Sequence, residues 1–135
     1  MDKKFLKKII AQSPEDLQII SACCSEAQVK TSEIKYLPST KIFLISLLRF
    51  DKENENNNNS INSIIKFEFI ESSKSKNIDQ KRPKMLMELI AIDVFKKELN
   101  FEITLLFSQN RFITLSSEVI EVTLEDQNLK DDKNN

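Results

Sequence analysis

The chain has 135 residues with 20 basic and 21 acidic side chains, so its net charge is -1 and no global field attracts nucleic acid or an anionic membrane. It contains neither histidine nor glycine. These absences exclude histidine general bases, glycine-rich phosphate loops and the usual nucleophile elbow. Left-handed turns must then use asparagine or aspartate. The length fits a single domain.

The two cysteines, Cys23 and Cys24, are adjacent. Neighbouring residues rarely form a disulfide, because a trans peptide strains the Cα and Cβ geometry that the bridge needs. Two free thiols on a helix, one of them half-buried, predict a reducing, cytoplasmic setting. A vicinal redox or metal pair is the weaker alternative, since histidine is missing. We therefore expect no metal site, no cofactor and, without an apolar run of about twenty residues, no membrane insertion.

A helix start is visible at Ser13 and Pro14. Ser13 can cap the helix, Pro14 suits the first helical position, and the two acids that follow favour the positive end of the helix dipole. Three residues repeat at helical spacing and should face the sheet: Leu17, Ile20 and Cys24. The sequence predicts a helix over residues 14–26.

The apolar segment 42–50 is expected to be the central strand. It is rich in β-branched and aromatic residues, which favours a strand over a helix. Both of its faces are apolar, which is typical of a strand covered on both sides. The asparagine-rich tract 52–60 follows, and its composition predicts a mobile hairpin loop.

Apolar runs and period-two alternation predict the remaining strands. With the central strand, they cover residues 5–11, 29–36, 42–50, 64–70, 85–95, 101–107, 112–115 and 119–124. A helix is the alternative for the last range. In residues 64–70, Ile65, Phe67 and Phe69 should share one face. Residues 72–83 should form a lysine-rich polar connection.

The predicted fold class is α+β, as one domain over residues 1–126. One N-terminal helix packs on a curved antiparallel meander sheet or partial barrel of about six or seven strands. Residues 127–135 are expected to be a disordered charged tail. Parallel α/β folds are excluded because crossover helices are missing.

Arg49 and Asp51 lie two apart on the central strand and therefore share a face. Arg49 suits recognition of a carboxylate or phosphate, but we favour an internal ion pair with Asp51 or Asp79, because a lone buried guanidinium is too costly. The residues predicted for binding are Arg49, Phe50, Asp51, Asp79, Arg82 and Pro83.

No catalytic residue is predicted. Glu88 and Asp93 interrupt an apolar strand, but their odd spacing places them on opposite faces. The paired acids Glu125 and Asp126 resemble those of a helix start or a charged tail, where capping and solubility explain them.

Six short motifs occur in a distinctive order: Ser-Pro-Glu-Asp-Leu (13–17), Tyr-Leu-Pro (36–38), Arg-Phe-Asp (49–51), Ile-Asp…Arg-Pro (78–83), Leu-Ile-Ala-Ile (89–92) and Val-Ile-Glu-Val-Thr-Leu-Glu-Asp (119–126). Their order resembles domain of unknown function family 2948, over about residues 5–126. That family is mainly alphaproteobacterial and has no established activity. The resemblance implies a bacterial protein domain that acts inside the cell. It does not imply a mechanism.

Two departures accompany the resemblance. The tryptophan and acid that usually follow Arg-Phe-Asp are Lys52 and Glu53 here. Family glycines correspond to Asn77, the turn 108–110 and Asn128, which agrees with the tolerance of asparagine for left-handed turns.

We expect a non-catalytic binding or adaptor module for a protein or a small anionic partner. A small carboxylate and arginine enzyme is one alternative. A weak nucleic-acid binder using residues 74–84 is another, but the neighbouring aromatic residues belong to strands, so no stacking platform is evident. A solvated connection is the favoured interpretation of residues 74–84.

Overall fold

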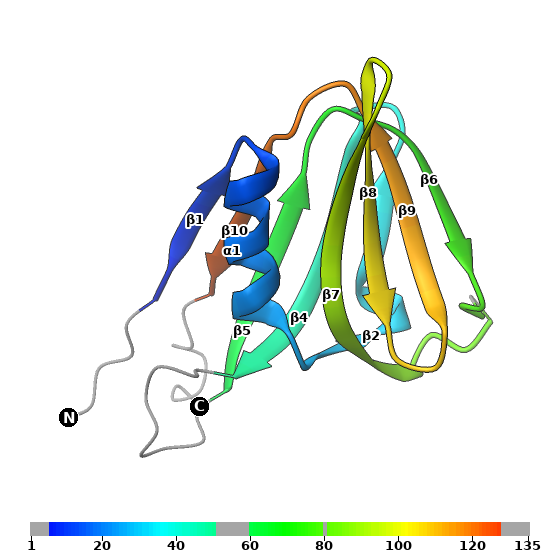
Figure 1. Cartoon of the computed structure of the whole chain (residues 1–135). Helices are drawn as coiled ribbons and strands as arrows, with labels where there is room; N and C mark the ends of the chain where they lie inside the picture. Colours follow the sequence, from blue (N-terminus) through cyan, green and yellow to red (C-terminus); the bar gives the residue numbers. More distant parts are fainter. Residues whose placement is uncertain (1–5, 51–59, 80, 128–135) are drawn as a thin grey trace.

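The computed structural model describes residues 6–50, 60–79 and 81–127. These residues form one helix, a short 3-10 turn and a ten-stranded antiparallel sheet (Figure 1). The helix α1 is Pro14–Cys24 and the turn η1 is Thr31–Glu33. The strands are β1 Lys8–Ala11, β2 Ala27–Lys30, β3 Ile34–Leu37, β4 Ile42–Phe50, β5 Ser60–Phe67, β6 Ile70–Lys76, β7 Leu86–Lys97, β8 Asn100–Phe107, β9 Arg111–Ser117 and β10 Val122–Asp126.

The strand order in the sheet is β1-β10-β5-β4-β2-β7-β8-β9-β6, and β3 also pairs with β4. One helix on an open, antiparallel sheet agrees with the predicted class. The prediction of six or seven strands is wrong, and the sheet is not a simple meander. Among the described strands, the sequential neighbours that pair are β3–β4, β4–β5 and β7–β8–β9, whereas β10 inserts between β1 and β5 and β6 pairs with β9.

Two segments account for much of the difference in strand number. The predicted strand 29–36 is divided by η1 into β2 and β3. Most of β6 lies within the predicted polar connection 72–83. Serine and lysine can form a strand there because β6 is the last strand of the sheet and pairs only with β9, and such edge strands tolerate polar and charged side chains.

The helix agrees closely with its sequence signals. The side chain of Ser13 accepts a hydrogen bond from the backbone N–H of Asp16 at 3.1 Å, and Pro14 begins the helix. α1 ends at Cys24, two residues before the predicted end. The predicted stripe of Leu17, Ile20 and Cys24 is buried. α1 packs against β1, β4 and β7 (Figure 1).

The core lies on one side of the sheet. On β4, Phe43, Ile45, Leu47 and Arg49 are buried, whereas the alternate residues are half-buried. The prediction that this strand is covered on both sides is therefore correct for one face only. The final range is a strand, β10, and its residues Val122 and Leu124 belong to the same core.

The alternation predicted through Phe69 is interrupted. Ile65 and Phe67 are buried as expected, but Phe69 has a left-handed backbone (φ 61°) and is 52% exposed. Seven described residues have such positive φ angles: Glu26, Lys41, Phe69, Asn77, Glu98, Gln109 and Asn110. The prediction that asparagine or aspartate fills these positions is wrong for five of them. Tertiary structure imposes these backbone angles against local preference.

Two predicted disordered regions lie largely outside the described residues. Phe50 pairs with Ser60, so residues 51–59 connect two antiparallel neighbours, β4 and β5. At the expected tail, the backbone N–H of Gln127 donates to the carbonyl of Asn62 at 2.7 Å, so the ordered structure extends one residue further than predicted. α1 has eleven residues, and within the described part of the chain no helix has the length and apolarity needed to cross a membrane.

Candidate functional site

Arg49 forms an internal ion pair with Asp126. Its Nε donates to Oδ1 of Asp126 at 2.9 Å, and its Nη2 donates to Oδ2 at 2.6 Å. The side chain of Arg49 is 2% exposed and that of Asp126 is 0% exposed. Two parallel hydrogen bonds between a guanidinium and a carboxylate form the strongest geometry available to this pair. Sheet pairing produces the contact, because β5 lies between β4 and β10.

The carboxylate of Asp126 has two further donors. The hydroxyl of Ser63 donates to Oδ1 at 2.6 Å, and the backbone N–H of Lys7 donates to Oδ2 at 2.7 Å. Each carboxylate oxygen thus accepts two hydrogen bonds. We call Arg49, Ser63 and Asp126 the buried charged centre. Its hydrogen bonds connect β4, β5 and β10 with the segment that precedes β1. They also replace the water that the fully buried carboxylate of Asp126 cannot contact.

Both charged groups are held in their ionised forms. Burial alone would raise the pKa of Asp126, but the hydrogen bonds from Arg49, Ser63 and Lys7 outweigh it and lower that pKa below its usual value. The hydrogen bond to Asp126 raises the pKa of Arg49, although burial acts in the opposite direction. The centre is therefore a stable ion pair and has no proton to exchange near neutral pH.

The predicted partners of Arg49 need correction. Asp51 lies outside the described residues, and Asp79 is exposed in a distant turn where its carboxylate accepts from the backbone N–H of Lys81 at 2.9 Å. The true partner, Asp126, was assigned to capping or solubility because it precedes a charged tail. A signal for its burial existed, since Asp126 continues the alternation of Val122 and Leu124 onto the same face.

The other predicted binding residues lie in two places. Asp79, Arg82 and Pro83 are exposed in the connection between β6 and β7. Phe50 stays beside Arg49: it is half-buried, and both residues line a hollow beside α1. The structure thus separates Arg49 from Asp79, Arg82 and Pro83, which the sequence prediction had combined.

We call residues 74–84 the basic connection. It has five basic residues and one acid in eleven positions, a net charge of +4, so the rest of the chain carries -5. All five cations are exposed: Lys74, Lys76, Lys81, Arg82 and Lys84. In the described part of the chain, none of them forms an ion pair. Exposed and unpaired, they create a local positive field on an acidic molecule.

The backbone of the basic connection is fixed by its neighbours. The backbone N–H groups of Thr31 and Ser32 donate to the carbonyls of Met85 at 3.0 Å and Pro83 at 2.8 Å. At the other end, the side-chain amide of the left-handed Asn77 donates to the carbonyl of Asn110 at 2.6 Å. The basic connection is therefore braced against the rest of the fold near both of its ends, at Asn77 and Pro83.

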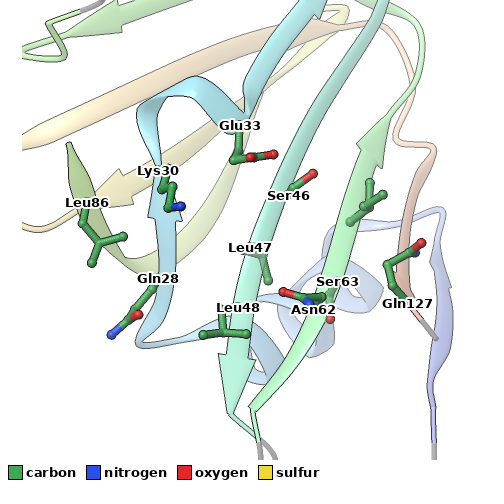
Figure 2. Close-up of a pocket in the computed structure, with 11 residues that line it drawn as sticks. Gln28, Lys30, Glu33, Ser46, Leu47, Leu48, Asn62, Ser63, Leu86 and Gln127 are labelled. Atoms are coloured by element: carbon green, nitrogen blue, oxygen red, sulfur yellow. The ribbon is translucent and has the colours of Figure 1, made fainter. Parts of the chain in front are cut away.

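A groove of about 420 Å³ crosses the outer face of the sheet beside this connection (Figure 2). It forms where β2 and β4 diverge, since Gln28 and Leu48 are their only paired residues within the described register. Figure 2 shows residues of β2 and Leu86 on one side, β4 along the middle, and Asn62 with Gln127 on the other. Its lining consists of four apolar residues (Leu47, Leu48, Ile64, Leu86), three amides (Gln28, Asn62, Gln127), two serines (Ser46, Ser63) and one ion of each sign (Lys30, Glu33).

The groove was not predicted from the sequence. Its residues come from four strands, the turn η1 and the residue after β10, so no local motif unites them. The two cysteines form no disulfide with each other, and Cys24 is buried while Cys23 is half-buried. Among the described residues, no cluster of three or more cysteine or acidic side chains has the geometry to hold a metal ion.

One comparison with known proteins returned a match. A family model described as "Protein of unknown function (DUF2948)" matches residues 7–134, nearly the whole chain. This is the family inferred from the order of the six motifs, so that prediction is confirmed. No curated protein and no solved structure matches the chain.

Proposed function

We propose a binding function for this chain, which belongs to the family described as protein of unknown function (DUF2948). It is a non-catalytic module that recognises an acidic segment of a partner protein through the basic connection. The observation that carries this proposal is the group of five exposed cations that form no ion pair with any residue the structure describes. We place the module in the cytoplasm, where cysteines such as Cys23 and Cys24, which form no disulfide with each other, stay reduced.

The positive charge of the basic connection favours an acidic partner. Exposed ion pairs contribute about 0–1 kcal/mol each, so several must act together to give useful affinity. Charge complementarity also speeds association and orients the encounter. Because Pro83 and Asn77 are hydrogen-bonded to other parts of the fold, little backbone entropy is lost when the cations engage a ligand.

A protein partner fits better than a nucleic acid. Residues 74–84 contain no aromatic side chain, so they offer no surface on which a base can stack. The remainder of the molecule carries a net charge of -5, which would repel a long polyanion that extends beyond the connection. A short acidic segment avoids that repulsion.

A non-catalytic role fits the disposition of the carboxylates. The carboxylate of Asp79, the acid within the basic connection, accepts a hydrogen bond from the backbone N–H of Lys81, and its backbone carbonyl accepts one from the backbone N–H of Arg82. The buried Asp126 is occupied by Arg49 and Ser63. Neither acid is arranged as a general base beside an open cleft.

Charge reversal tests the proposal. The variant Lys81→Glu/Arg82→Glu/Lys84→Glu changes three exposed cations, and its matched control, Lys8→Glu/Lys35→Glu/Lys97→Glu, makes the same change of charge on other exposed positions. Fluorescence anisotropy with a labelled peptide of six glutamates separated by serines measures binding at low salt. We expect the first variant to lose at least about tenfold in affinity and the control about twofold.

Two results would contradict the proposal. Equal losses in the two triple variants would show that only the net charge matters. A labelled oligothymidine that binds more tightly than the acidic peptide, and loses affinity in the connection variant, would instead favour the nucleic-acid alternative.

A further inference from the structure

The groove and the basic connection are continuous. Lys30, on the groove wall, pairs in register with Leu86, which is the first residue of β7 and also lines the groove. Both the backbone N–H and the hydroxyl of Thr31 donate to the carbonyl of Met85, at 3.0 and 3.2 Å. The chain therefore passes directly from the cations of the connection into the wall of the groove.

The chemistry of the groove differs from that of the connection. Leu86 is 54% exposed, while Leu48 and Ile64 are half-buried, so they present apolar surface that the monomer leaves open. The amides of Gln28, Asn62 and Gln127 surround that surface, and each can donate to a carbonyl or accept from an N–H. Apolar surface with amides around it suits an extended main chain that carries an aliphatic side chain.

Charge sets the orientation of such a ligand. The groove lining contains one cation, Lys30, and one anion, Glu33. Their charges cancel, so the groove itself has no net attraction for an acidic side chain. The cations without partners begin outside it, at Lys84 and Arg82. An acidic run is therefore favoured over the connection and disfavoured inside the groove.

We propose that the groove binds an aliphatic residue and the adjoining main chain of the same partner segment whose acidic run lies over the basic connection. The ligand is an extended peptide in which one or two leucine-like residues are next to several acids. This inference rests on the proposed function and adds which peptide sequences the module would prefer. The groove volume of about 420 Å³ lies in the range of about 300–1,000 Å³ that is usual for ligand sites. No aromatic side chain lines the groove, which disfavours a stacked base.

Two labelled peptides test the inference: one with two leucines followed by six glutamates, and one in which serines replace the leucines. We expect the wild-type protein to bind the leucine peptide about tenfold more tightly, because an aliphatic side chain is removed from water. Leu86→Ser should reduce this preference to less than about twofold, because it weakens binding of the leucine peptide far more than binding of the serine peptide. The matched control is Leu99→Ser, which removes a leucine that is 86% exposed in the turn between β7 and β8.

The outcomes separate this inference from the proposed function. If both peptides bind equally and the connection variant weakens both, the proposed function stands and the groove inference is wrong. If neither peptide responds to charge reversal in the connection, the proposed function itself fails. Loss of the leucine preference in Leu99→Ser would show non-specific apolar contact. A concentration-dependent dimer that Leu86→Ser abolishes would assign the groove to a second copy of the chain and overturn the inference.

Discussion

Arg49 and Arg82 belong to the same predicted binding set, but they occupy opposite environments. Arg49 lies in the buried charged centre, where Asp126 receives its Nε and Nη2. Arg82 lies in the basic connection, exposed and with no ion pair to any described residue. A buried guanidinium must find its carboxylate within the fold, whereas an exposed one is available to a ligand. The type of side chain therefore does not determine what each arginine does. What decides it is whether the fold supplies a carboxylate partner for the guanidinium, as it does for Arg49.

The largest expected effect comes from breaking the buried charged centre. Arg49→Ala would leave the carboxylate of Asp126 buried without its cation and should lower the free energy of unfolding by about 3–5 kcal/mol. Arg82→Ala should change it by less than about 0.5 kcal/mol, because the side chain is exposed. Urea denaturation monitored by circular dichroism measures both. Equal effects in the two variants would remove the distinction between the regions.

Arg49→Ala is severe enough to prevent folding, so a second variant is useful. Replacing the whole centre by apolar residues, in the variant Arg49→Met/Ser63→Ala/Asp126→Leu, removes both side-chain donors together with the acceptor, and the backbone N–H of Lys7 stays. Such replacements are often neutral or stabilising when the volume is similar. We expect the triple variant to recover most of the stability lost in Arg49→Ala. Failure to recover would show that the individual hydrogen bonds, and not charge compensation, hold β10 in place.

Strong acid should weaken the buried charged centre. The pKa of Asp126 is lowered in the folded protein, so its stabilising contribution is present above the unfolded pKa of about 3.9 and is lost as pH falls further through the folded pKa. The raised pKa of Arg49 has an effect only in strong alkali. The difference in unfolding free energy between wild type and Asp126→Asn should therefore be constant from about pH 5 to 7 and shrink below about pH 4. A difference that grows on acidification would contradict this sign.

The smallest expected effect concerns the bracing of the basic connection. Asn77→Ala removes the hydrogen bond to Asn110 and places alanine in a left-handed conformation, at a cost of about 1 kcal/mol. Asn77→Gly keeps the backbone angle accessible and loses only the hydrogen bond. We expect the alanine variant to be the less stable of the two in thermal melts, and both to bind the glutamate peptide about twofold more weakly. Unchanged affinity in both would show that the connection needs no bracing.

The secondary structure was predictable where local chemistry decides it. Ser13 and Pro14 fix the helix start, and the β-branched run gives β4 its bounds. β6 was missed because its serines and lysines resemble a loop, and only the pairing with β9 makes them a strand. The order of the strands was not predictable, since the insertion of β10 between β1 and β5 depends on contacts more than fifty residues apart in sequence.

The candidate site was predictable in part. The expectation that Arg49 must meet a carboxylate is correct, but the partner was sought nearby, at Asp51 and Asp79, and it lies 77 residues away. Arg82 and Pro83 were placed correctly in an exposed segment. The groove had no sequence signal, because its apolar and amide residues converge from separate strands.

The most direct test of the division between the two regions is an amide chemical-shift titration of the ¹⁵N-labelled protein with the peptide of two leucines and six glutamates. We expect saturable shifts in the non-proline residues of 76–86 and around Lys30 and Asn62, which line or adjoin the groove, with little change at Arg49, which does not line it. Shifts centred on the buried charged centre, or spread evenly over exposed lysines throughout the molecule, would contradict it.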